Sequence, residues 1–93
     1  MNILEEANEL TGGDRQQDYG HPLDNYQRLA DMMTGYLGAR LNGDLTAQDA
    51  GMFMVLCKVA REATKHKRDN LVDGAGYFRV IEMMRDEVKR RAD

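Results

Sequence analysis

The side chains best suited to chemistry lie in one segment of the sequence, KVAREATKHKRDNLVDGAGY, which runs from Lys58 to Tyr77. Four cations in it are three, four and three residues apart, so they share one side of a helix: Lys58, Arg61, Lys65 and Arg68. Guanidinium and ammonium groups in such a strip bind phosphate oxygens. The pattern therefore predicts a local anion site on this helix.

Two polar side chains of the same segment, Asn70 and Asp73, fall on the apolar stripe of the next helix, which also carries Tyr77. A carboxylate that faces a protein interior is costly unless it is paired or hydrogen-bonded. The short link between the two helices makes them antiparallel neighbours. We therefore expect Arg61 to approach Asp73, and Lys58 to approach Tyr77.

This polar cluster has two interpretations, and residue types alone do not separate them. As a site, Lys58 and Arg61 hold phosphate oxygens while Asp73 positions a metal, a ribose hydroxyl or the two cations. As a structural feature, the carboxylate and the cations form an internal ion pair that fixes the register of two helices.

A loop rich in groups that bind or transfer protons, GGDRQQDYGHP, runs from Gly12 to Pro22. Functional residues are commonly carried on such loops. We expect Arg15 to hold a phosphate, Tyr19 to stack on a base and His21 to titrate near neutral pH. The alternative is a solvated connector in which His21 caps the helix that follows.

The elements that must position these residues are helices, because apolar residues recur with helical periodicity and no strand-like alternation persists. The sequence predicts a single all-α domain over residues 1–93, with a short N-terminal helix and three longer helices. Pro22 suits the first turn of a helix, and Thr46 with Asp49 resembles a capping box. The expected helices run over about Asn2–Leu10, Pro22–Leu41, Ala47–Lys65 and Asn70–Arg90.

The third expected helix contains AGMFMVLC, from Ala50 to Cys57, without one polar side chain. A helix that is apolar on every side is usually buried on every side. We therefore expect this helix to be central in the fold, to form a subunit interface, or both, and we predict a homo-oligomer, specifically a dimer. Cys57, the single cysteine, is expected to be a packed, reduced thiol rather than a nucleophile.

Size and charge narrow the classes of function. A chain of 93 residues buries only about 60% of its unfolded surface, so its core is thin. The formal net charge of -3 argues against a duplex-DNA binder, which carries an excess of Lys and Arg. The sequence shows no leader-like start and no stretch long enough to span a membrane. We therefore expect a cytoplasmic protein without a membrane partner.

Three pieces of the chain resemble a family of small phage and prophage proteins of unknown function: ILEEANELTGGDRQQDYGHPLDNYQRLA, TAQDAGMFMVLCKVAREA and KRDNLVDGAGYFRV. The resemblance covers nearly the whole chain. Its most specific parts are GDRQQDYGHPLDN and KRDNLVDGAGY, because these fix polar residue types at set distances. The resemblance implies a phage origin and, with it, the cytoplasm of the host cell.

More distantly, the arrangement is similar to the all-α nucleoside triphosphate pyrophosphohydrolases of the MazG type, and to phage domains tied to nucleotide modification. Enzymes of the MazG type bind Mg²⁺ through an ExxE on one helix and an ExxD on a later one. Here Glu6 and Glu9 have the first spacing, and Asn70 and Asp73 stand in for the second motif. The resemblance implies a MazG-like fold, nucleotide ligands and Mg²⁺ as the candidate ion. The spacing of residues predicts no zinc site, since neither histidine has a second ligand at the right distance along the chain.

Three functions follow from these features. The first is binding of a nucleotide or related phosphorylated ligand, and the second is a divergent Mg²⁺-dependent pyrophosphohydrolase that uses Asp73 with Glu6, Glu9, Asp14 or Asp18. The third is a non-catalytic interaction module that acts on a host or phage protein, with the polar cluster as internal glue. For the first function, the site is lined by Arg15, Tyr19, His21, Lys58, Arg61, Asn70, Asp73 and Tyr77.

Overall fold

A computed structural model describes residues 1–12 and 21–93, and within these residues the chain is helical, with no strand. This confirms the prediction of an all-α fold with a short first helix and three longer ones. The helices are α1 (Ile3–Gly12), α3 (Pro22–Leu37), α4 (Ala47–Thr64) and α5 (Arg68–Ala92), with a short 3-10 helix over Gly38–Arg40.

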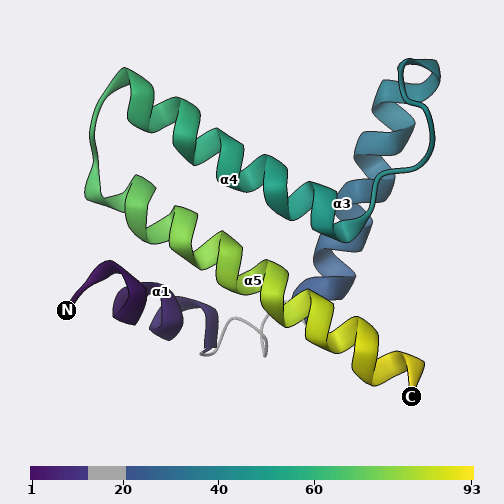
Figure 1. The fold of residues 1–93 in the computed structure, drawn as a ribbon. Helices are drawn as coiled ribbons and strands as arrows, with labels where there is room; N and C mark the ends of the chain where they lie inside the picture. The colour runs from purple at the N-terminus through teal and green to yellow at the C-terminus, as the bar shows by residue number, and fades with distance from the viewer. Residues whose placement is uncertain (13–20) are drawn as a thin grey trace.

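The longest helix, α5, lies in the middle of the molecule (Figure 1). Helix α4 runs antiparallel beside it, as the short connection between them predicts, and α1 packs on the side of α5 away from α4 (Figure 1). Helix α3 crosses the pair near the beginning of α4. The fold is flat, with extents of 41 × 37 × 21 Å.

The predicted helix starts at Pro22 and Ala47 are confirmed. Pro22 occupies the first turn of α3, where its missing N–H has no partner to lose. At α4, the Thr46 hydroxyl accepts from the Asp49 amide and the Asp49 carboxylate accepts from the Thr46 amide. This reciprocal capping box satisfies donors that an α-helix start leaves free.

The predicted end of α3 at Leu41 is wrong. The α-helix stops at Leu37 because Gly38 adopts a positive φ of 54°, a conformation that glycine takes without steric cost. A single 3-10 turn follows, and the Leu45 amide then donates to the Thr34 hydroxyl at 3.0 Å. The chain thereby turns back toward α3 before α4 begins.

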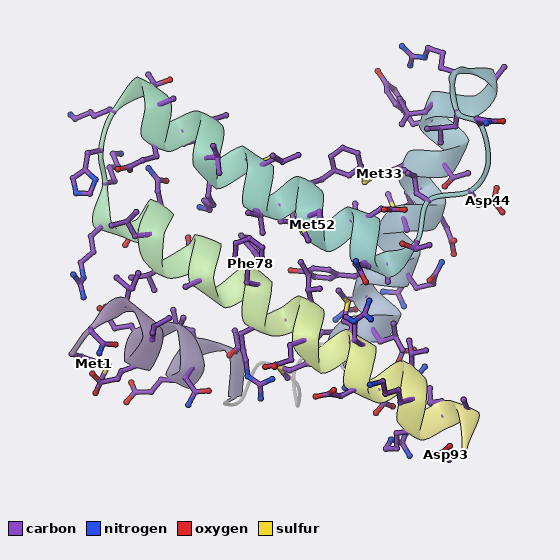
Figure 2. All side chains as sticks on the ribbon, in the orientation of Figure 1. Met1, Met33, Asp44, Met52, Phe78 and Asp93 are labelled. Carbon is purple, nitrogen blue, oxygen red and sulfur yellow. The ribbon has the colours of Figure 1, made fainter. Side chains whose placement is uncertain are left out.

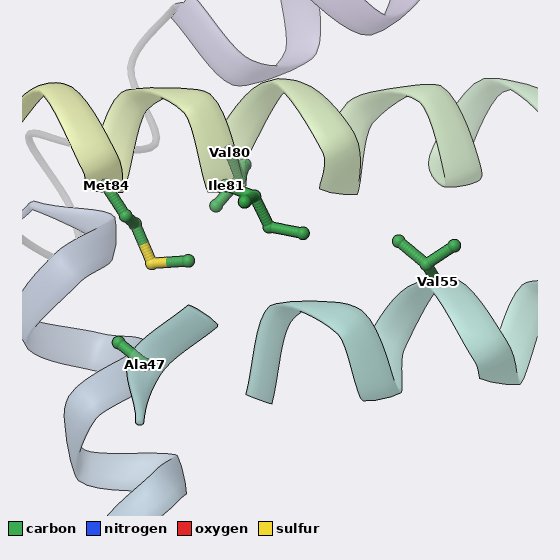
Figure 3. Close-up of a cluster of buried hydrophobic side chains, with 5 residues drawn as sticks. All are labelled: Ala47, Val55, Val80, Ile81 and Met84. Carbon is green, nitrogen blue, oxygen red and sulfur yellow. The ribbon is translucent and has the colours of Figure 1, made fainter. Parts of the chain in front are cut away.

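The hydrophobic core is small and lies where α4 meets the middle of α5. Its buried members are Ala47 and Val55 of α4 with Val80, Ile81 and Met84 of α5 (Figure 3). Partly buried side chains surround this cluster: Leu23, Tyr26 and Tyr77. A core of this size leaves much of each helix surface outside it.

The expectation of a central third helix is wrong for the single chain. Among the described helices, α4 packs only on α5 and α3, so it lies at the edge of the molecule. Its apolar residues surround the helix, and no described element covers its outer side. Cys57 shows the same error, since it is exposed rather than packed.

Candidate functional site

The predicted polar cluster is centred on an ion pair between α4 and α5. The Lys58 ammonium lies 2.9 Å from the Asp73 carboxylate, and the exposed fractions of the two side chains are 13% and 36%. We expected Arg61 to reach Asp73, and this detail is wrong. Lys58 points toward α5, whereas Arg61, three residues later, is exposed. The charge of Lys58 is therefore already balanced.

Asn70 is buried, as predicted, and its side chain also joins the two helices. Its amide nitrogen donates to Glu62 at 3.1 Å. Tyr77 lies two turns further along α5 and packs against the hydrophobic core. The inward stripe of α5 thus contributes two residues to polar cross-links with α4, while Tyr77, Ile81 and Met84 lie in or against the hydrophobic core.

Glu62 organises the connection between α4 and α5, and the sequence predictions missed it. Its carboxylate lies 2.5 Å from the His66 ring, accepts from Asn70, and accepts from the Lys67 amide at 3.1 Å. Hydrogen bonds from His66, Asn70 and the Lys67 backbone lower the pKa of Glu62 to about 2. The spacing of four residues between Glu62 and His66 was the available signal, although α4 ends at Thr64, before His66.

The remaining cations of the predicted strip do not converge. Arg68 reaches away from α4, donating to Glu6 and to the Met1 carbonyl, the latter at 2.8 Å, and so ties α1 to α5. Arg61 and Lys65 are exposed. The spacing along the sequence placed four cations on one helix side, but the chain turns before Arg68, which belongs to α5.

His21 lies at the other end of α5 from this cluster. Its Nδ1 accepts from the Leu23 amide at 3.0 Å, so it caps α3 as the alternative interpretation expected. Its Nε2 is 3.9 Å from Glu87, which is fourteen residues, or about 21 Å, along α5 from Asp73. The structure therefore does not bring His21 together with Lys58 and Asp73. Arg15 and Tyr19 lie outside the described residues.

Glu87 is a buried carboxylate that the sequence predictions also missed. It accepts hydrogen bonds from Arg90 and Arg91, which lower its pKa to about 2. Arg91 also donates to Asp24 of α3 at 3.0 and 3.2 Å. These contacts tie the last turns of α5 to the start of α3. Their role is to hold helices together.

An apolar groove of about 530 Å³ lies on one side of the α4–α5 pair. Val59 and Ala63 of α4 line it on one side, Leu71 and Phe78 of α5 line it on the other, and Ile3 of α1 is also among its lining residues. Figure 2 shows Phe78 in the space between the two helices. The walls of this groove present few polar atoms.

The groove continues onto the outer side of α4, where Met52, Leu56 and Val59 recur at helical spacing and Phe53 lies beside them. Met52, Phe53, Leu56 and Val59 are all exposed, by 39% to 59%. Together with the groove residues Leu71 and Phe78, which are 42% and 54% exposed, they form what we call the apolar surface. It is defined as Met52, Phe53, Leu56, Val59, Leu71 and Phe78.

The acidic residues implied by the MazG resemblance have other partners. Glu6 is bound by Arg68 and Asp73 by Lys58, so each carboxylate is already matched with a cation. Across residues 1–12 and 21–93, no three His, Cys, Asp or Glu side chains gather closely enough to hold a metal ion. Nor does this part of the chain contain a helix long and apolar enough to cross a membrane.

Comparison with known families gives a match over residues 2–85 to a family described as a domain of unknown function (DUF6378). This chain belongs to the DUF6378 family. The apolar surface and the polar cluster both fall within the matched residues of this DUF6378 chain.

Relatives of this DUF6378 chain occur in mycobacterial phages. It is 37% identical over 86 residues to the "Gene 55 protein" of Mycobacterium phage D29, covering 91% of the chain and 54% of the relative. It is 36% identical over 85 residues to the "Gene 55 protein" of Mycobacterium phage L5, covering 90% and 53%. The chain thus spans about half the length of these relatives. No solved structure matches the chain.

Proposed function

We propose that this DUF6378 chain is a non-catalytic interaction module, in which the apolar surface binds the apolar side of a helix from another polypeptide. The observation that carries this proposal is the outer side of α4, where Met52, Leu56 and Val59 are exposed at helical spacing and Phe53 is exposed beside them. Soluble proteins rarely keep large contiguous apolar patches exposed without a partner. Helix-in-groove binding uses apolar anchors at such spacing.

The polar cluster supports the same function by its structural role. Lys58 is paired with Asp73, and Asn70 is bonded to Glu62, so these four groups cross-link α4 and α5. Such cross-links fix the register of the helix pair that carries the apolar surface. The ligand interpretation of Lys58 and Asp73 would require a phosphate to displace an existing ion pair.

The phage relatives support a phage setting, so we propose that the module acts on a phage or host protein in the host cytoplasm. The relatives are phage proteins, and they are about twice as long as the matched region. The residues of these relatives that lie outside the matched region are available for functions that this helical unit does not carry.

Site-specific photo-crosslinking tests the interaction function. A photoreactive phenylalanine analogue replaces Val59, which is 59% exposed on the apolar surface, or Val88, which is 54% exposed on α5 outside it. In cells that make the protein, the analogue at Val59 should give a discrete covalent adduct with a polypeptide identified by mass spectrometry. The analogue at Val88 should give little. Equal yields at both positions, or none at Val59, would contradict the function.

A second candidate function, binding of a nucleotide or other phosphorylated ligand, is favoured by one observation. Arg61, Lys65 and Lys67 are exposed around the α4–α5 connection, and no carboxylate of the described residues lies within ion-pair distance of them. If they hold phosphate, nucleotides should raise the melting temperature of the parent protein, and Arg61→Gln should reduce that shift without lowering stability. Absence of any shift with a panel of nucleotides and Mg²⁺ would remove this candidate.

A further inference from the structure

We infer that the polypeptide covering the apolar surface is a second copy of this chain, with the two α4 helices packed antiparallel about a two-fold axis near Leu56. This inference rests on the proposed function, because it names the partner of the same surface. Three features support the inference: the area of the apolar surface, the symmetry of its residues along α4, and the charges at the two ends of α4.

The area of the apolar surface matches what half of a dimer interface needs. From their exposed fractions, its six large side chains present roughly 500 Å² of apolar area to solvent. A stable interface buries about 800 Å² on each partner, with an apolar centre inside a polar rim. The exposed apolar area thus accounts for the centre, and neighbouring polar residues of α4 and α5 supply the rim.

The apolar residues of α4 are distributed evenly about Leu56. Met52 lies four residues before it and Val59 three residues after it, all on the outer side of the helix. In an antiparallel pair with a two-fold axis at Leu56, Met52 of one copy meets the region of Val59 of the other, and the two Leu56 side chains meet at the axis. An interface of this kind uses the same patch on both subunits.

Each copy offers both a ridge and a groove. The row Met52, Leu56 and Val59 forms the ridge, and the groove between α4 and α5 lies directly beside it because Val59 belongs to both. Helices pack by fitting the ridges of one into the grooves of another. A two-fold axis therefore places the ridge of each copy beside the groove of the other. The dimer then contains a four-helix arrangement made of two α4–α5 pairs.

The charges of α4 favour the antiparallel direction. Its first turn carries Asp49, whereas its last turn carries Arg61, with Lys65 following at the helix end. Antiparallel packing opposes the helix dipoles and brings Asp49, which lies seven residues before Leu56 on the same side of α4, toward the last turn of the other copy's α4. Parallel packing would bring like charges together. No charged side chain lies between Asp49 and Arg61 except Lys58, which is paired with Asp73.

Sedimentation of the purified protein tests this inference with no other polypeptide present. We expect a species of twice the 10.6 kDa chain mass at micromolar concentration. Val59→Glu should dissociate it while leaving the helical circular dichroism intact, because Val59 is exposed in the single chain. The matched change Val88→Glu, at a valine of similar exposure outside the surface, should leave the mass unchanged.

Disulfide trapping tests the direction of packing with changes that do not threaten the fold. In a Cys57→Ser background, Leu56→Cys should give an oxidised dimer, because a two-fold axis at this residue brings the two sulfur atoms together. Ala63→Cys should not, because antiparallel helices hold the two positions about 21 Å apart. Trapping of both variants would show parallel packing and overturn the arrangement.

The outcomes separate this inference from the function on which it rests. A monomeric purified protein whose Val59 position still cross-links to a different polypeptide in cells would overturn the second-copy inference and leave the interaction function standing. A monomer with no adduct at Val59 would overturn both. A dimer that Val59→Glu and Val88→Glu affect equally would show that the copies meet elsewhere, which also overturns the inference.

Discussion

Among single residues, Lys58 and Asp73 occupy the positions with the strongest expected effect on stability. The Lys58 side chain is only 13% exposed, so its ammonium group has little water to replace a lost carboxylate. We expect Asp73→Ala to lower the free energy of unfolding by about 2 kcal/mol, between the values for exposed and fully buried ion pairs, because Asp73 is itself about one-third exposed. Chemical denaturation measures this change directly.

The control for this prediction lies on the same helix. Arg79 and Glu82 form a surface pair with side chains 41% and 67% exposed. Glu82→Ala should change the free energy of unfolding by less than about 0.5 kcal/mol. Equal effects of Asp73→Ala and Glu82→Ala would mean that Lys58 finds water or another acceptor when Asp73 is removed.

Sequence reasoning at this scale predicted which residues turn inward more reliably than it predicted their partners. Asn70 and Asp73 both face α4, because they continue the apolar period of α5. The choice of Lys58 rather than Arg61 as the partner of Asp73 depends on how far α5 is rotated against α4, and helical spacing within one helix does not fix that rotation. Glu62 was missed because its partners come from the connection and the next helix.

For the helices as elements, α4 and α5 approach each other closely at Gly51. A Cβ atom at this position would lie 2.7 Å from Cγ1 of Ile81, and that atom is held in the core. Gly51→Ala should therefore destabilise the fold by about 1 to 3 kcal/mol through overpacking, although alanine is the better helix former. The measurement is the free energy of unfolding in denaturant.

Gly35 of α3 provides the opposite case. It is exposed, and a Cβ atom there would have no neighbour within 4 Å. Gly35→Ala should stabilise the protein by about 0.5 to 1 kcal/mol, because only the helix propensity changes. If Gly51→Ala proved equally stabilising, then α4 and α5 would be further apart than the structure places them.

The connection between α4 and α5 makes stability depend on pH through Glu62. Its pKa is about 2 in the folded chain, below the ordinary value of 4.5, so the ionised carboxylate stabilises the fold. This contribution is fully present above about pH 4.5 and is lost as the pH falls toward 2. The slope of unfolding free energy against pH across this window should be shallower in Glu62→Gln than in the parent.

A matched substitution on the exposed surface of α5 isolates this effect. Glu82 is 67% exposed and lies on α5 away from the connection. Glu82→Gln should keep the pH dependence of the parent between pH 4.5 and 2. An unchanged slope in Glu62→Gln would show that the hydrogen bonds from His66, Asn70 and Lys67 do not favour the charged form.

The helices themselves could be predicted well from sequence, because periodicity, Pro22 and the Thr46–Asp49 capping box are local signals. The early end of α3 was missed because the sequence through Leu41 keeps its apolar period, while the backbone of Gly38 leaves the helix. A pattern of apolar residues does not determine the backbone conformation of a single glycine.

For the whole molecule, local patterns did not predict which helix lies in the middle. The apolar run from Ala50 to Cys57 suggested α4, yet α5 holds the centre because, among the described helices, only α5 packs on three others, α1, α3 and α4. Gly76 of α5 lies beside Thr11 and Ala7 of α1, where an added Cβ atom would make ordinary van der Waals contacts. The surplus of apolar residues on α4 then remains on the surface, where a partner can cover it.

The whole-molecule arrangement also predicts how stability depends on concentration. The core of one chain is small, so covering the apolar surface with a second copy should contribute a large part of the total stability. Folding and association are then coupled, and a hundredfold rise in protein concentration should raise the melting temperature by about 5 to 10 °C. The melting temperature of Val59→Glu should be lower and independent of concentration, whereas Val88→Glu should follow the parent. A parent melting temperature that stays constant over this range would show that the single chain holds its fold alone, with α4 exposed to water.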